Sequence, residues 1–261
     1  MQPDLQPRHT VGASVAPLAE TGWRLEIPPG PAGQYRLAQL DDYSSLPRRS
    51  LPWQAPLVAR LRARVSAPDI SGTWGFGLWN DPFSLSLGLG GMVRRFPALP
   101  RAAWFFYAAP PNYLSFRDDL PAQGLLAATF NSPEIPPPLL ALGSLGLPLG
   151  FIPPAGRLLR RVVRGFVRQG AVQLGLNPVE WHSYSLVWRS GEVSFEVDGM
   201  RAASAVVAPA GRLGLVLWID NQFAAWGPDG RLRFGFLSTP QPAWLEIADY
   251  SIRIDNPASP G

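Results

Sequence analysis

Few residue types in this sequence can carry out chemistry, and most of those that can are acidic. The 261 residues include no cysteine, which excludes thiolate nucleophiles, disulfides and cysteine-based zinc sites. His9 and His182 are the only histidines, so a histidine-rich metal site is excluded as well. We interpret His182 as a histidine in the core or at the edge of a sheet, whose ring nitrogens are hydrogen-bonded to neighbouring groups. Carboxylates are therefore the main candidates for catalysis.

Two carboxylates follow aromatic segments that have the pattern of strands. Asp81 comes after Trp79 and Asn80, and Asp220 comes after Trp218. Two carboxyl groups on one face can cleave a glycosidic bond, because one donates a proton while the other attacks the sugar or activates water. Asn-Asp-Pro and Asp-Asn also form turns, which is the alternative interpretation. We therefore assign no catalytic residue and keep Asp81 and Asp220 as weak candidates.

Aromatic side chains offer a second chemistry, the binding of sugars. The C–H faces of a sugar stack on aromatic rings, and a few polar groups fix its orientation. Gly75 and Gly77 alternate in phase with Trp79, so they are expected to leave room for a ligand beside that ring. A sandwich core also needs aromatic residues, and packing is the alternative role for each ring. The predicted carbohydrate-binding residues are Trp79, Asn80, Asp81, Trp104, Trp218 and Asp220.

The elements that must position these residues have the pattern of short strands. The 30 prolines and 26 glycines suit a chain of strands and turns. The predicted fold is all-β, a two-sheet antiparallel jelly-roll sandwich with one amphipathic helical insertion. We expect residues 1–20 to be a loose leader and residues 21–261 to form a single sandwich domain, with the insertion at about 133–175. Strand patterns cover residues 23–27, 35–40, 57–65, 72–83, 101–112, 181–198, 212–220, 231–237 and 244–254.

The clearest local signal is a hairpin over residues 181–199, WHSYSLVWRSGEVSFEVDG. In its first strand, His182, Tyr184, Leu186 and Trp188 share one face. Arg-Ser-Gly-Glu then forms a turn, after which Val193, Phe195 and Val197 share a face. Asp198 and Gly199 are predicted to turn the chain a second time.

The insertion contains a helical pattern over residues 157–170. Apolar residues gather on one side of this helix and arginines on the other, without an acidic residue between them. A helix this short needs a surface for its apolar side. The sandwich is one such surface, an anionic membrane is a second, and a protein partner is a third. The residues predicted for membrane or partner contact are Arg157, Arg160, Arg161, Arg164, Phe166 and Arg168.

The hairpin resembles the "FHxYxxxWxxxxIxxYxDG" hairpin of laminarinase-like enzymes of glycoside hydrolase family 16. The matching residues are Trp181 to Tyr184, Trp188, and Val197 to Gly199. The closing strand LEIADYSIRI and the aromatic strand GTWGFGLWNDP are also similar to strands of that family, whereas residues 133–180 are not covered. The resemblance implies the concanavalin A-like lectin/glucanase fold and a sugar-binding surface.

The catalytic strand of that family is missing. Its chemistry needs Glu-x-Asp-x-x-Glu or a close variant on one strand, so that the carboxylates share a face about 5 Å apart. The strand expected to carry it contains AAWFFYAA, and the motif occurs nowhere in the chain. The resemblance therefore carries the fold but not the enzymatic activity.

Charge and composition limit the classes of partner and cofactor that the protein is expected to bind. All 23 basic residues are arginine, and the formal net charge is +4. The arginines of the helix lack interleaved aromatics, so no nucleic acid is expected. No cofactor is expected either; a structural calcium, which this fold often carries, is compatible with the sequence but has no identifiable ligands. With no signal peptide or apolar spanning segment, the chain as given is expected to be cytoplasmic, or peripheral to a membrane.

Three functions follow from these observations. The first is a non-catalytic carbohydrate-binding, lectin-like module on a glucanase-like scaffold. The second is a glycoside hydrolase with relocated carboxylates that acts on a β-glucan-like polysaccharide. The third is a membrane-surface protein that uses the apolar and basic insertion. The sequence sets neither the sugar nor the oligomeric state.

Overall fold

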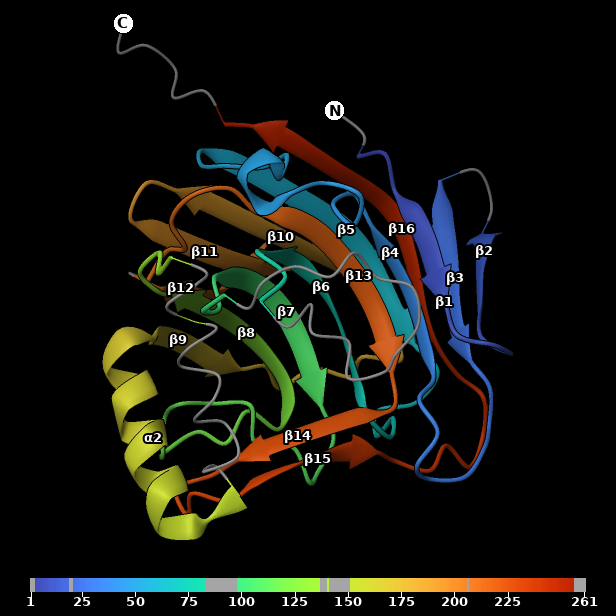
Figure 1. The fold of residues 1–261 in the computed structure, drawn as a ribbon. Helices are drawn as coiled ribbons and strands as arrows, with labels where there is room; N and C mark the ends of the chain where they lie inside the picture. The colour runs from blue at the N-terminus through green and yellow to red at the C-terminus, as the bar shows by residue number, and fades with distance from the viewer. Residues whose placement is uncertain are drawn as a thin grey trace, which may run out of the picture.

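A computed structural model shows that the chain folds into two large antiparallel sheets packed face to face (Figure 1). The structure describes residues 3–18, 21–82, 98–136, 140, 151–205 and 207–255. Each large sheet has seven strands, and one two-stranded sheet accompanies them. The prediction of an all-β two-sheet sandwich with a helical insertion is confirmed.

The first sheet has its strands in the spatial order β1 (Gln6–His9), β4 (Leu37–Asp41), β13 (Gly214–Asp220), β6 (Thr73–Trp79), β7 (Ala102–Ala108), β8 (Gly124–Asn131) and β9 (Arg168–Gln173). The second has the order β12 (Met200–Ala205), β11 (Glu192–Val197), β10 (His182–Arg189), β5 (Leu57–Val65), β16 (Ala243–Ile254), β3 (Gly22–Ile27) and β2 (Ser14–Leu18). The small sheet pairs β14 (Gln222–Trp226) with β15 (Leu232–Phe236). A 3-10 turn, η1, spans Arg48–Ser50, and the helix α2 spans Pro153–Phe166.

The main core lies between the two large sheets. It forms because alternate side chains of each strand point to opposite faces. In β6, Trp74, Phe76 and Leu78 point inward and are buried in this core. They meet side chains of the second sheet such as Tyr184 and Phe195, whose rings contact Phe76 and the neighbouring Phe105. The residues of β6 between them, from Thr73 to Trp79, point away from the core.

The predicted hairpin is confirmed in detail. β10 and β11 pair in register from Tyr184 opposite Val197 to Arg189 opposite Glu192. Gly191 has a φ of +83°, which a glycine adopts readily in such a tight turn. Asp198 and Gly199 both have positive φ, as expected for the central residues of a type I′ turn between β11 and β12.

His182 is satisfied by its neighbours, in agreement with the sequence interpretation. Its Nδ1 lies 2.6 Å from Asp198 Oδ2, and its Nε2 lies 2.9 Å from the carbonyl oxygen of Asn177. Burial opposes the charged ring, but these two partners outweigh it and raise the pKa of His182. The ring therefore ties the start of β10 to the turn after β11.

The expectation of a loose leader over residues 1–20 is wrong. β1 pairs with β4 along one edge of the first sheet, and β2 pairs with β3 along one edge of the second. Most side chains of both strands are exposed, so neither strand has the alternation of buried and exposed residues that marks a strand in sequence. Pro7 and Pro17 are tolerated because edge strands leave some backbone groups unpaired.

The helix begins earlier and ends sooner than predicted. α2 spans Pro153–Phe166, and the residues from Arg168 onward form β9 instead of a last helical turn. Proline at the first helical positions is favourable there, because its missing N–H would have no helical partner. The preceding apolar stretch proposed for membrane contact lies largely outside the described residues, at 137–139 and 141–150.

Candidate functional site

The outer face of the first sheet carries a cluster of large rings. We call Trp79, Trp104, Phe106 and Trp218 the aromatic face. They come from β6, β7 and β13, and alternation turns all four away from the main core. Trp104 lies 5.6 Å from both Phe106 and Trp218 between ring centroids, and Trp79 lies 5.9 Å from Trp104. Phe106 and Trp218 stack at 6.0 Å.

Glycines in β6 make this cluster possible. Gly75 pairs with Trp218 on one side and with Phe106 on the other, so the two rings can lie across it. A Cβ atom added to Gly75 would lie 2.7 Å from Cη2 of Trp218. One added to Gly77 would lie 2.5 Å from Cα of Trp104. The expectation that these glycines leave room for a ligand is therefore wrong, because protein atoms occupy the space.

The four rings differ in exposure. Phe106 and Trp218 are buried, with 6% and 9% of their surface exposed, whereas Trp79 and Trp104 are half-buried. The indole N–H of Trp218 donates to Thr73 Oγ1 at 2.9 Å. The indole nitrogens of Trp79 and Trp104 are buried and have no hydrogen-bond partner among the described residues. A buried N–H without an acceptor is unusual in a folded protein.

A polar network closes one end of the aromatic face. Thr73 Oγ1 donates to Asp220 Oδ1 at 2.7 Å and accepts the indole N–H of Trp218. The backbone N–H of Gln222 also donates to Asp220. Burial raises the pKa of Asp220 to about 7, although these hydrogen bonds act in the opposite direction. Burial and the nearby Asp220 also raise the pKa of Tyr35. Sequence reasoning missed Thr73 and Tyr35, which only the strand register brings to Asp220.

The two candidate catalytic carboxylates lie at opposite ends of β6. Asp220 is next to Thr73, at the start of the strand, whereas Asp81 follows Trp79 at its end. Six residues of extended strand span roughly 20 Å. Glycosidases need their two carboxyl groups about 5–9.5 Å apart. Asp81 and Asp220 therefore do not form a catalytic pair.

Asn80 and Asp81 hold a turn at the end of β6. The Asn80 amide donates to the carbonyl oxygen of Leu99 at 2.9 Å and accepts from the backbone N–H of Arg101 at 3.0 Å. Asp81 has a φ of +48° and is buried, and its carbonyl oxygen accepts a hydrogen bond from Arg48. Both residues thus have the turn role that was the alternative interpretation, and the polar groups of Asn80 already have partners.

The adjacent pair Asp41 and Asp42 is also more ordered than a solvated turn. Asp41 is fully buried and accepts hydrogen bonds from Gln39 and from the backbone of Ser44. Asp42 accepts from the indole of Trp53 and from the backbone of Leu215. Burial raises the pKa of Asp42 to about 6. These acids link β4 to its neighbours.

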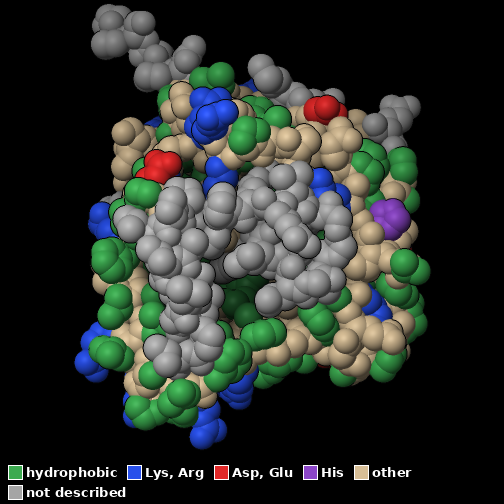
Figure 2. All heavy atoms as spheres, in the orientation of Figure 1, with side chains coloured by type: hydrophobic (Ala, Val, Ile, Leu, Met, Phe, Trp, Pro, Cys, Tyr) green, Lys and Arg blue, Asp and Glu red, His purple; other side chains and the backbone are tan. Residues whose placement is uncertain are grey.

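The space-filling view shows a hollow on the side of the molecule that faces the viewer in Figure 1 (Figure 2). Hydrophobic side chains are visible at its bottom (Figure 2). Among the described residues, no group of three or more His, Cys, Asp or Glu side chains could hold a metal ion.

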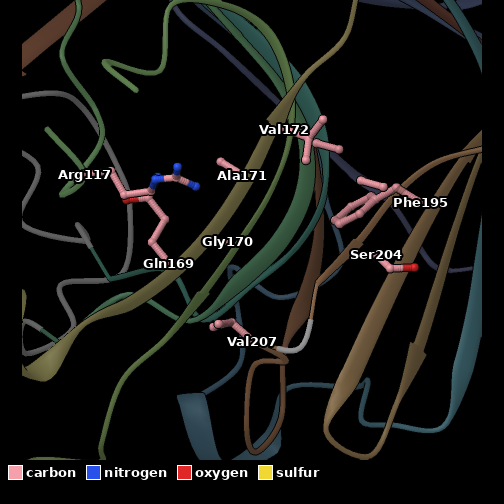
Figure 3. A pocket seen from close by; sticks show the side chains of 10 residues that line it. Arg117, Gln169, Gly170, Ala171, Val172, Phe195, Ser204 and Val207 are labelled. Atoms are coloured by element: carbon pink, nitrogen blue, oxygen red, sulfur yellow. The ribbon is translucent and has the colours of Figure 1, made fainter. Parts of the chain in front are cut away.

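A separate cavity of about 260 Å³ lies between the free edges of the two sheets, next to β9 and β12 (Figure 3). Arg117 and Gln169 line it from one side and Phe195 and Ser204 from the other (Figure 3). A second cavity of about 340 Å³ adjoins it and is lined by the predicted contact residues Arg164 and Arg168. Neither cavity includes a residue of the aromatic face.

The arginines of the insertion do not act as one surface. Arg160 is buried and points to the body of the protein, whereas Arg157, Arg161, Arg164, Phe166 and Arg168 are exposed. Leu158, Val162 and Phe166 are also exposed, so these three side chains do not lie on the sandwich, whereas Val163 and Val167 pack against Phe130. That alternative is wrong for these three residues. Among the described residues, no helix is long and apolar enough to cross a membrane.

Comparison with known proteins identifies the fold. No protein-family model and no curated protein sequence matches this chain. A solved glycoside hydrolase family 16 endo-glucanase from Bacteroides ovatus is 9% identical over 95% of this chain and 94% of its own, with a TM-score of 0.51. A second family 16 structure, from the Bacteroides ovatus mixed linkage glucan PUL, is 8% identical over the same shares, with a TM-score of 0.50.

A legume lectin-like domain from Entamoeba histolytica is 5% identical over 97% of this chain and 90% of its own, with a TM-score of 0.49. At such identities the similarity to the family 16 glucanases shows the fold alone. The chain has the concanavalin A-like sandwich fold, as the hairpin and the closing strand indicated.

Proposed function

We propose that this protein is a non-catalytic carbohydrate-binding, lectin-like module whose ligand contacts the aromatic face at Trp79 and Trp104. The observation that carries the proposal is the cluster of four rings on the outer face of a sheet, two of which are half-buried. These rings lie outside the main core; Phe106 and Trp218 belong to a second buried cluster with residues such as Tyr43, and the partly exposed Trp79 and Trp104 pack against it.

The chemistry of the cluster suits a sugar. A half-exposed indole presents a flat apolar surface to the C–H face of a pyranose ring. The indole nitrogens of Trp79 and Trp104 are buried, so the ligand contact that we propose is the ring surface and not these donors. Asn80 and Asp220 are not proposed as polar anchors, because their side chains are bonded within the protein.

Hydrolysis is the second candidate, and no observation in the described residues favours it. Asp81 and Asp220 lie at opposite ends of β6. Asp220 is held by Thr73 and the backbone of Gln222, so it is bound in a structural network. A binding role requires neither carboxylate to reach a ligand.

Calorimetric titration with β-glucan oligosaccharides, followed by a broader glycan panel, tests the proposal. The wild-type protein is expected to bind, with a change in tryptophan fluorescence, and Trp79→Ala to bind about tenfold more weakly, because it removes one stacking surface. Trp181→Ala is the matched control, since Trp181 lies on the other sheet beneath Arg62 and Arg64. Circular dichroism and thermal unfolding establish that both variants are folded.

Two outcomes would contradict the proposal. Absence of binding across the glycan panel removes the carbohydrate ligand altogether. Turnover of a chromogenic glucan that is lost in Asp81→Asn would instead make the protein a hydrolase.

A further inference from the structure

The helix α2 lies on the protein with Arg160 inward. Arg160 has only 4% of its surface exposed, and its Nη2 donates to Asp118 Oδ1 at 2.9 Å. The guanidinium of Arg160 also lies 5.5 Å from the ring centroid of Tyr113. Arg164, one turn later, bonds to the other oxygen of Asp118. Arg160 Nη1 is buried with no partner among the described residues, so this packing has an energetic cost.

The position of α2 is fixed from two further sides. Val163 packs against the small cluster around Phe130 and Val167. Gly230, in the turn between β14 and β15, lies so close that an added Cβ would be 2.4 Å from the Arg157 nitrogen and from the Pro153 carbonyl oxygen. The outward side of the helix is therefore set by contacts on the opposite side.

That outward side is apolar. Leu158, Val162 and Phe166 are spaced four residues apart, which places them in one stripe along the helix. Their exposed fractions are 60%, 49% and 50%. Phe151 and Ile152, just before the helix, are 57% and 54% exposed and extend it. We call these five residues the outer stripe; α2 runs along the margin of the molecule in Figure 1.

The charges beside the stripe are positive. Arg161 is exposed and lies within one turn of Leu158 and Val162. Arg157 and Arg168 are exposed as well. The helix contains no acidic residue, and the carboxylate of Asp118 beside it is already bonded to Arg160 and Arg164. An apolar stripe flanked by arginines is complementary to a surface that has an apolar interior and an anionic outer layer.

We propose that α2 is an interfacial helix that binds an anionic lipid bilayer through the outer stripe. The stripe would lie at the level of the acyl chains, and Arg157, Arg161 and Arg168 would contact headgroup phosphates. A second protein is a weaker fit, because five side chains are few beside the 20 to 30 residues that a stable protein interface uses on each side. This surface is separate from the aromatic face.

Co-sedimentation with vesicles tests the proposal, using phosphatidylcholine vesicles with and without phosphatidylglycerol. The full chain is expected to bind the vesicles that contain phosphatidylglycerol, and high salt is expected to weaken binding because it screens the headgroup charge. Val162→Glu should weaken binding by more than about tenfold, because it places a carboxylate in the apolar stripe. Arg161→Ala should weaken it about fivefold.

Ile254→Glu and Arg60→Ala are the matched controls, since Ile254 is 64% exposed and both residues lie on the second sheet. Both controls should bind like the wild type. The proposal is overturned if the wild type stays in the supernatant at low salt, or if Val162→Glu binds as the wild type does. It is also overturned if Val162→Glu abolishes self-association in size-exclusion chromatography while no vesicle binding is seen, since a second copy would then cover the stripe.

Discussion

The two outer faces of the sandwich both carry tryptophans, but their surroundings differ. On the aromatic face, Trp79, Trp104 and Trp218 contact one another and leave two indole N–H groups without acceptors among the described residues. On the outer face of the second sheet, which we call the arginine face, Trp181 and Trp244 lie beneath arginines. Ring contacts dominate one face and cation–π contacts the other.

The carboxylates show the same contrast. On the arginine face, Glu246 is 3% exposed and lies 3.0 Å from Arg24 and 2.7 Å from Arg64, so its charge is paired. On the aromatic face, Asp220 is buried, and among the described residues its bonds come from neutral donors such as Thr73. On the same outer face as Asp220, Asp41 does lie 3.2 Å from Arg8, so the contrast concerns Asp220 and Glu246 and not every acid of the two faces.

The largest effect on this contrast is expected from Trp218→Ala. It removes a buried ring that contacts Trp104 and Phe106, and it removes the indole N–H that donates to the Thr73 hydroxyl. The free energy of unfolding should fall by about 3–5 kcal/mol, as for other buried aromatic residues. Chemical denaturation measures this change. Trp181→Ala on the arginine face should cost under about 1 kcal/mol; similar losses for both variants would contradict the contrast.

The next effect is a dependence of stability on pH. The pKa of Asp220 is raised to about 7 in the folded protein, whereas an unfolded aspartate titrates near about 4. The folded state thus holds the proton of Asp220 more tightly than the unfolded state does. The protonated Asp220 therefore contributes fully to the free energy of unfolding below about pH 4, and this contribution is lost as the pH rises through about 7. This loss amounts to at most about 4 kcal/mol.

Asp220→Asn should remove the part of the pH dependence that Asp220 contributes and leave that of Asp42, and denaturant titrations at pH 4 to 8 would measure this reduction. Asp69→Asn, at an exposed site, should leave the pH dependence unchanged. If the free energy of unfolding depends on pH in the same way for the wild type and Asp220→Asn, then ionisation of Asp220 does not destabilise the folded protein, and the prediction is wrong.

The smallest effect is expected from Glu246→Gln on the arginine face. The change keeps the shape but leaves Arg24 and Arg64 without their shared carboxylate. Because both arginines are more than one third exposed, water screens them, and the loss should be about 1–2 kcal/mol. Glu26→Gln, whose carboxylate is 34% exposed, should cost at most about 0.5 kcal/mol. The decrease in the free energy of unfolding caused by Glu246→Gln should be smaller in high salt. A decrease that is the same in high salt would show that packing, and not ion pairing, stabilises this face.

Sequence reasoning predicted the strands that carry their own alternation. β10 and β11 follow the predicted hairpin, and β6 and β13 lie within the predicted strand segments 72–83 and 212–220. It missed β1 and β2, because these strands are held by backbone pairing at sheet edges and bury few side chains. The candidate site was predicted in part: the rings share one face, but the polar residues near them are occupied.

The amino-acid sequence by itself determined the all-β class, the hairpin turns and the absence of a Glu-x-Asp-x-x-Glu strand, because these depend on neighbours along the chain. The tertiary structure alone decided the separation of Asp81 from Asp220, the filling of the space at Gly75 by Trp218, and the inward side of α2. Strand register sets the first two, since it fixes which distant residues face each other. The third depends on Asp118, a residue 42 positions from Arg160 that bonds this arginine on the inward side of the helix.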